Sequence, residues 1–325
     1  MIIKFLGVRG SIASPLSQSE YRGKLHGILR QAAGRGFQSD DPDEIDEFLH
    51  SLAPDLRYIC GGNTTCLTIT RPEVPMPVIL DCGTGIRALG DELMAGPCGR
   101  GEGEVHIFLT HTHWDHIQGL PFFKPIYIPG NKLHFYSAMD DLEERLQAQQ
   151  NHRFFPIPLE DMAAEKIFHF LPPKEGAAEL PGGLQADSFA LRHPGGSHAF
   201  RFRSPDGQVF IFATDAEFTG EDLNVLDDYA DFFSNADLVV LDAQYSLDES
   251  FSKFDWGHTS NTMAVNCGAH WKVKNLVLTH HEPAYTDARL YENFQGAMEH
   301  KKNMNVERPN LYLAREGQVF RLGVQ

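Results

Sequence analysis

The feature that most constrains this chain is the run Thr-His-Thr-His-Trp-Asp-His at residues 110–116, directly after an apolar segment at 105–109. Four side chains that can bind a metal lie within six positions: His111, His113, Asp115 and His116. In an extended chain, residues two apart point to the same side, so His111 and His113 can hold one ion. A turn after the strand can direct Asp115 and His116 toward a second ion. Imidazole and carboxylate ligands favour zinc, with manganese or iron open if further oxygen ligands join.

The composition predicts a globular protein in a reducing compartment. Hydrophobic residues make up 42% of the 325 residues, which is enough for a large core without cross-links. The five cysteines show no Cys-x-x-Cys pair, so we interpret them as free thiols. The chain starts as a strand at residues 1–6, and no apolar run approaches the length of a membrane span. We therefore expect a cytoplasmic protein that does not contact membranes.

The charge balance bears on the substrate. Twenty-eight basic and 44 acidic residues give a formal charge of −16, and two divalent cations would offset only four of these charges. An acidic exterior repels polyphosphate, which favours a small anionic phosphodiester over long RNA as the substrate. No Lys/Arg tract typical of nucleic-acid binding is present, although a local basic patch is compatible with the net charge. RNA and a homodimeric state both stay open.

Apolar runs that predict strands alternate, in the later part of the chain, with segments that predict helices. The expected strands are 2–6, 66–69, 78–80, 105–109, 132–136, 185–190, 199–202, 209–213, 238–241, 275–278 and 311–313. The expected helices are 85–94, 140–149, 260–270 and 286–302. Residues 172–183, rich in Pro, Gly, Ala and Glu, predict a surface loop. This pattern indicates an α/β class.

Eight short segments, taken in order, resemble the metallo-β-lactamase fold hydrolases, and most closely their phosphodiesterase-like branch that includes ribonuclease Z. They are Phe-Leu-Gly-Val-Arg-Gly-Ser at 5–11, Gly-Gly-Asn-Thr at 61–64, Leu-Asp-Cys-Gly-Thr-Gly at 80–85, the histidine run, His-Pro-Gly-Gly-Ser at 193–197, Ala-Thr-Asp at 213–215, Gly-His-Thr-Ser at 257–260 and Leu-Thr-His-His at 278–281.

The resemblance implies a four-layer αββα sandwich of two mixed β-sheets flanked by helices, with metals at the sheet edge. It also implies a single hydrolase domain over residues 1–325. One departure is a long connection at 15–57, where family members have a short one. Its composition predicts a helical insertion with helices at 20–33 and 43–52. A solvated decoration, a substrate lid and a dimer contact are the alternatives for its role.

The resemblance further implies two divalent metal ions and their ligands. By matched position, His111, His113 and His193 would hold the first ion, Asp115, His116 and His280 the second, and Asp215 would bridge both. His198 and His281 are the neighbours most easily confused with the ligands. Adjacent residues in a strand point to opposite sides, so we expect only one of His280 and His281 to reach the metals.

Catalytic and supporting roles follow from the same resemblance. His258 matches a general-acid histidine, with helix capping nearby as its alternative role, and Asp115 is placed beside it as a catalytic residue. Asp81 would fix the tautomer of a ligand histidine. The remaining candidates would contact the metal ligands or the substrate. They are Asn63, which alternatively completes a turn; His281; and Asp287, which alternatively begins a helix.

The implied function is a phosphodiesterase in which a metal-bridging hydroxide attacks phosphorus and His258 protonates the leaving oxygen. A ribonuclease Z-like endonuclease is the alternative within this chemistry, and a thioesterase or lactonase of the same fold is the alternative outside it. A β-lactamase is disfavoured because no secretion signal is visible. A di-iron oxygen-reducing role would place glutamate where His113 stands. A non-catalytic metal sensor would be expected to have lost ligands, and none is missing.

Overall fold

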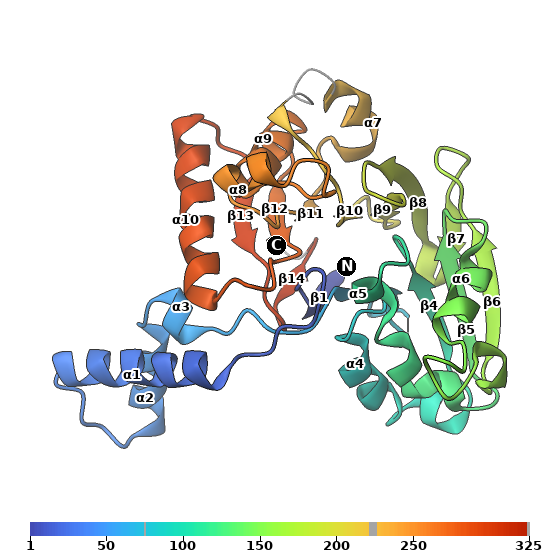
Figure 1. Cartoon of the computed structure of the whole chain (residues 1–325), viewed down its shortest axis with the longest axis horizontal. Helices are drawn as coiled ribbons and strands as arrows, with labels where there is room; N and C mark the ends of the chain where they lie inside the picture. Colours follow the sequence, from blue (N-terminus) through green and yellow to red (C-terminus); the bar gives the residue numbers. More distant parts are fainter. Residues whose placement is uncertain (75, 221–225, 324–325) are drawn as a thin grey trace.

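Two seven-stranded sheets pack face to face with helices on their outer faces, in a computed structural model that describes residues 1–74, 76–220 and 226–323 (Figure 1). The expected αββα sandwich of two mixed sheets is confirmed. Among the described residues, every helix is too short or too polar to cross a lipid bilayer.

The first sheet has the strand order β14-β1-β2-β3-β4-β5-β6. Its strands are β1 (Ile2–Gly7), β2 (Cys66–Thr70), β3 (Val78–Leu80), β4 (Glu104–Phe108), β5 (Lys132–Ser137), β6 (Glu165–Phe170) and β14 (Val319–Arg321). The pairs from β3 to β6 are parallel, and the pairs from β14 to β3 are antiparallel.

The second sheet has the order β13-β12-β11-β10-β9-β8-β7. Its strands are β7 (Ala178–Leu180), β8 (Leu184–Leu191), β9 (Ser197–Arg203), β10 (Val209–Ala213), β11 (Leu238–Asp242), β12 (Asn275–Thr279) and β13 (Asn310–Leu313). The pairs from β10 to β13 are parallel, so the chain leaves β10, β11 and β12 at the same edge of the sheet.

Helices cover the outer face of each sheet. On the first sheet these are α4 (Ile86–Leu93), α5 (Trp114–Ile117) and α6 (Leu142–Gln149). On the second they are α7 (Ala230–Phe233), α9 (Asn261–His270) and α10 (Asp287–Asn303), with α8 (Leu247–Ser252) beside α9. Short 3-10 turns lie at Pro97–Arg100, Leu120–Phe122, Lys124–Tyr127, Leu159–Asp161, Pro181–Gly183 and Leu226–Tyr229.

Alternation along the strands divides the core between the two faces of each sheet. In β4, Phe108 joins the core between the sheets, where its ring meets Phe200 and Phe202 edge-on at 5.2 and 5.1 Å. The neighbouring Ile107 and Leu109 pack instead under the outer helices. Strands buried on both faces need apolar residues throughout, which explains the continuous apolar runs that predicted them.

Three strands escaped prediction: β6, β7 and β14. The expectation of a loop over 172–183 was wrong, because β7 lies within it and pairs with β8. β6 and β14 are edge strands with half-exposed or exposed side chains, and β7 has only three residues. Edge strands carry a weaker apolar signal because only part of their surface is buried.

The connection at 15–57 contains α1 (Gln18–Gly34), α2 (Pro42–His50) and α3 (Pro54–Arg57). A capping box starts α1, since Ser17 and Glu20 each bond to the other's backbone N–H. α1 buries no residue, and α1 and α2 project from the body as an arm (Figure 1). Phe37 stacks on Phe48 at 4.6 Å within this arm.

Candidate metal centre

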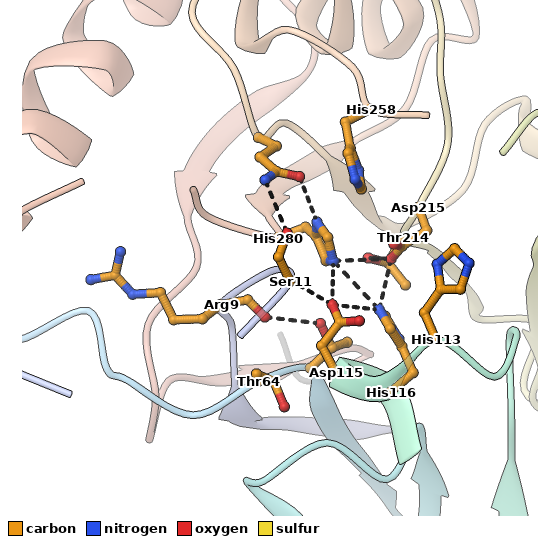
Figure 2. A network of polar contacts seen from close by, with 12 residues as sticks. Arg9, Ser11, Thr64, His113, Asp115, His116, Thr214, Asp215, His258 and His280 are labelled. Carbon is orange, nitrogen blue, oxygen red and sulfur yellow. Dashed lines mark hydrogen bonds and ion pairs between the residues drawn. The ribbon is translucent and has the colours of Figure 1, made fainter. Parts of the chain in front are cut away.

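The site lies where loops from both sheets meet. The run at 111–116 leaves the end of β4 in the first sheet. His193, Asp215 and His280 follow β8, β10 and β12 of the second sheet. Carboxyl ends of parallel strands lie at one edge, which is the usual position of binding sites in such sheets. Residues that are distant along the chain are thereby brought together (Figure 2).

Two groups of ligand-type atoms share Asp215, and within each group the atoms lie within 4.8 Å of one another. The first group is His111, His113, His193 and Asp215, and the second is Asp115, His116, Asp215 and His280.

Asp215 belongs to both groups. Its Oδ1 lies 3.6 Å from Nε2 of His111 and of His193. Its Oδ2 lies 3.0 Å from Nε2 of His116 and 3.2 Å from Nε2 of His280. One carboxylate therefore presents a separate oxygen to each group.

The donor set fits two divalent cations. The buried Nε2 of His111 has no hydrogen-bond partner within the described part of the chain. The outward ring nitrogens are held by other groups: Nδ1 of His111 by Thr110 Oγ1 at 3.0 Å, of His116 by Asp81 Oδ2 at 2.7 Å, of His193 by Gly257 O at 2.8 Å and of His280 by Gln244 Oε1 at 3.2 Å. Such partners orient the opposite nitrogen toward a metal.

The pKa shifts of His111 and Asp215 favour the protonation states in which these residues bind metals. Burial lowers the pKa of His111 well below its usual range, and the neighbouring His116 adds to this. Burial alone would raise the pKa of Asp215, but His116 and His280 hold it well below its usual range. Neutral imidazole and ionised carboxylate are the forms that bind metals.

The pKa of His280 is raised by an excess of negative charge in the site. Burial alone would lower its pKa, but Asp215, Asp115 and Asp242 raise it to about 9. These carboxylates are all buried, and buried charges need compensation by an opposite charge. A divalent cation bound in each group would supply it.

The backbone is strained where it delivers ligands. Asp215 and His280 have φ of 55° and 61°, in the left-handed region that non-glycine residues seldom adopt. Gly257 has a φ of +89°, and a Cβ there would lie 2.3 Å from Nδ1 of His193. Only glycine allows this approach.

His258 lies beside the two groups. Its Nδ1 is 2.7 Å from Oδ2 of Asp242, and its ring stacks on His280 at 4.8 Å. The side chain keeps 9% of its surface exposed. Asp215, Asp242, His258 and His280 also form a third set of ligand-type atoms, so proximity alone permits His258 to act as a ligand.

Of the residues expected to support the ligands or contact the substrate, Asp81 lies at the centre. It contacts His116 and accepts from Thr110 N at 2.9 Å. Asn63 bonds instead to Glu316, and Nε2 of His281 lies 2.9 Å from Ala314 O. Asp287 begins α10 and pairs with Lys24 at 2.9 Å. Among the residues that the structure describes, Asn63, His281 and Asp287 therefore lie outside both groups.

His198 also stays outside both groups, with its Nδ1 3.4 Å from Thr110 O.

Three contributors were missed by sequence reasoning. Asp242 partners His258, Gln244 holds His280, and the N–H of Ser11 donates to Asp115 Oδ2 at 2.7 Å. Asp242 had a signal, because it is an acid that directly follows the predicted strand at 238–241. Ser11 belongs to the matched segment at 5–11, but its contact is made by the backbone N–H, which a side-chain pattern does not predict. No pattern in the sequence indicated Gln244.

Known proteins with similar sequences and structures fit this geometry. A family model described as a β-lactamase superfamily domain matches residues 77–281, more than half of the chain. Ribonuclease Z of Acaryochloris marina is 24% identical over 270 residues, covering 69% of this chain and 82% of that protein.

Solved structures share the fold over nearly the whole chain. Unliganded yeast PDE1 superposes with a TM-score of 0.64 at 15% identity, covering 99% of both chains. The short form of human tRNase Z superposes with a TM-score of 0.59 at 16% identity, covering 100% of both. The chain is therefore a hydrolase of the metallo-β-lactamase superfamily, with ribonuclease Z enzymes among its relatives.

Proposed function

We propose that this protein is a dinuclear-metal phosphodiesterase acting on a small or cyclic phosphodiester. The observation that carries the proposal is the Asp242–His258 pair, which places a proton donor against His280 and His193 at the rim of the centre. A thiolate leaves a thioester without protonation, whereas an alkoxide that leaves phosphorus needs a proton, so this pair favours the phosphodiester over the thioester.

His111, His113 and His193 would hold one divalent ion, Asp115, His116 and His280 the other, and Asp215 both. Bound there, the two ions, zinc with manganese or iron as alternatives, would supply Lewis acidity and a nucleophilic water at neutral pH. Asp115 is kept in place by the N–H of Ser11, and Asp81 keeps His116 in the tautomer that presents Nε2 to the centre.

His258 supplies the proton to the leaving oxygen. Asp242 accepts the Nδ1–H, so Nε2 is the nitrogen left to carry the transferable proton. A positioned general acid of this kind contributes roughly 10²- to 10⁴-fold to the rate. The same carboxylate accepts from the N–H groups of Gln244 and Thr259 at 3.2 Å, which fixes the orientation of the pair.

The net charge of −16 favours a small anionic substrate. A ribonuclease Z-like endonuclease is the second candidate, supported by the ribonuclease Z relatives. We also propose that residues 1–325 form one domain, with 15–57 as a helical insertion. The five cysteines are all buried and none lies in a disulfide, which supports a cytoplasmic location.

The test is a comparison of substrates on metal-loaded protein. Bis-p-nitrophenyl phosphate, a 2′,3′-cyclic nucleotide, a precursor tRNA, a thioester and a lactone are assayed before and after chelation, and again after zinc or manganese is restored. We expect hydrolysis of the small phosphodiesters that chelation removes and metal restores. Hydrolysis of the thioester or lactone alone would overturn the proposal, and cleavage of the tRNA alone would select the second candidate.

A further inference from the structure

A hollow of about 400 Å³ opens beside His258, between α8 and α9. Its apolar lining among the described residues is Phe218, Leu247, Phe251, Phe254 and Met263. The volume lies in the range typical of small-molecule sites.

Its surface is built for a flat, apolar group. Phe218 and Met263 form a buried floor, at 3% and 5% exposure. Phe251 and Phe254 stand at the mouth with 77% and 51% of their surface exposed. Exposed aromatic rings over a buried apolar floor are the arrangement on which another ring system can stack.

The charges of the described lining residues favour an uncharged occupant. No lysine or arginine lines the hollow among the described residues. Of the lining residues that the structure describes, Glu217 alone carries a carboxylate. Its side chain is 4% exposed, and Oε1 accepts from Asp255 N at 2.8 Å. Ser250, Thr262 and Asn266 add neutral polar groups that can bond to the edge of a heterocycle.

The position of the hollow decides which part of a substrate it receives. One wall is His258, whose ring also contacts His280 and His193 of the metal centre. In the hydrolysis, a water oxygen forms a new bond to phosphorus, and the bond from phosphorus to the leaving oxygen breaks. The leaving oxygen departs with the proton of His258, which is regained from the attacking water. The leaving group must therefore lie next to His258.

We propose that this hollow binds the leaving group of the substrate, and that this group carries an uncharged aromatic ring system of the size of a nucleobase. The inference rests on the proposed phosphodiesterase function and specifies its substrate class. An aliphatic leaving group would gain much less from the two phenylalanine faces.

Direct binding of the neutral leaving-group alcohols tests the proposal. Metal-loaded protein is titrated calorimetrically with adenosine, with benzyl alcohol, and with cyclohexylmethanol as the aliphatic counterpart of benzyl alcohol. Phe251→Ala and Phe254→Ala are compared with Phe154→Ala, which removes a ring that is 82% exposed and lies outside the hollow. In Phe251→Ala and Phe254→Ala, the hollow variants, loss of a stacking partner should weaken the binding of adenosine roughly fivefold or more. The affinity of Phe154→Ala for adenosine should stay within about twofold of that of the unchanged protein.

The outcomes separate this inference from the proposed function. If bis-p-nitrophenyl phosphate is hydrolysed but adenosine binds the hollow variants and Phe154→Ala equally well, the leaving-group pocket is refuted and the phosphodiesterase stands. If adenosine binding falls only in the hollow variants while no phosphodiester is cleaved, the aromatic site is supported and the function is refuted. If benzyl alcohol binds no more tightly than cyclohexylmethanol, the preference for aromatic rings is refuted.

Discussion

Replacing His258 by alanine separates its role as a proton donor from a role as a metal ligand. His258 lies outside the two groups assigned to the metals and belongs only to the third set, with Asp242, Asp215 and His280, so the variant should keep both metals. Turnover should fall roughly 10²- to 10⁴-fold for substrates with alkoxide leaving groups, and less than about tenfold for p-nitrophenyl esters, whose leaving group needs no proton.

The same variant should also lose some stability. Asp242 is fully buried and would lose its bond to His258, keeping the N–H groups of Gln244 and Thr259 as donors. Loss of one bond to a charged group lowers the free energy of unfolding by about 1.5 to 3 kcal/mol.

Elemental analysis, kcat with the two substrate types and chemical denaturation measure these effects. His198→Ala is the control, because it removes a nearby half-buried histidine outside both ligand groups and should leave kcat nearly unchanged. A His258→Ala protein that has lost metal, or that slows p-nitrophenyl and alkyl esters equally, would refute the general-acid assignment.

Three further perturbations test other parts of the structure. Asp215→Ala should reduce metal content at both positions, because this carboxylate faces both groups; elemental analysis showing one ion still bound would contradict its bridging role. Gly257→Ala should displace His193 and lower metal affinity, since the new Cβ would lie 2.3 Å from Nδ1, whereas Gly207→Ala has a similar φ of +82° but nothing within 4 Å and should affect only stability. Burial, and next His134, lower the pKa of His106 to about 4, so the unfolded state takes up a proton near pH 6.5 that the folded state refuses. The free energy of unfolding should therefore fall as the pH drops from about 6.5 toward 4, and His106→Gln, measured by urea denaturation against an exposed His152→Gln control, should fall less steeply.

Local sequence was enough to predict most of the strands and helices. The apolar run at 209–213 corresponds to β10 residue for residue, because a strand buried between two layers must be apolar along its whole length. The edge strands β6 and β14 and the short β7 lacked such a run, since only part of each is buried. The histidine run at 111–116 was likewise visible, because its ligand-type residues are adjacent in the chain.

The sequence by itself thus determined the layered α/β class and the residue types of a metal centre, through patterns that span a few neighbouring residues. Only the tertiary structure decided that His280 faces Asp115 and Asp215 while His281 turns to Ala314, because the left-handed backbone at His280 sets these directions. It also decided that Asp242, 16 residues before His258, is its partner, and that α8 and α9 leave a hollow beside that histidine. Such contacts depend on where the strand ends meet, and this is set by the packing of the two sheets.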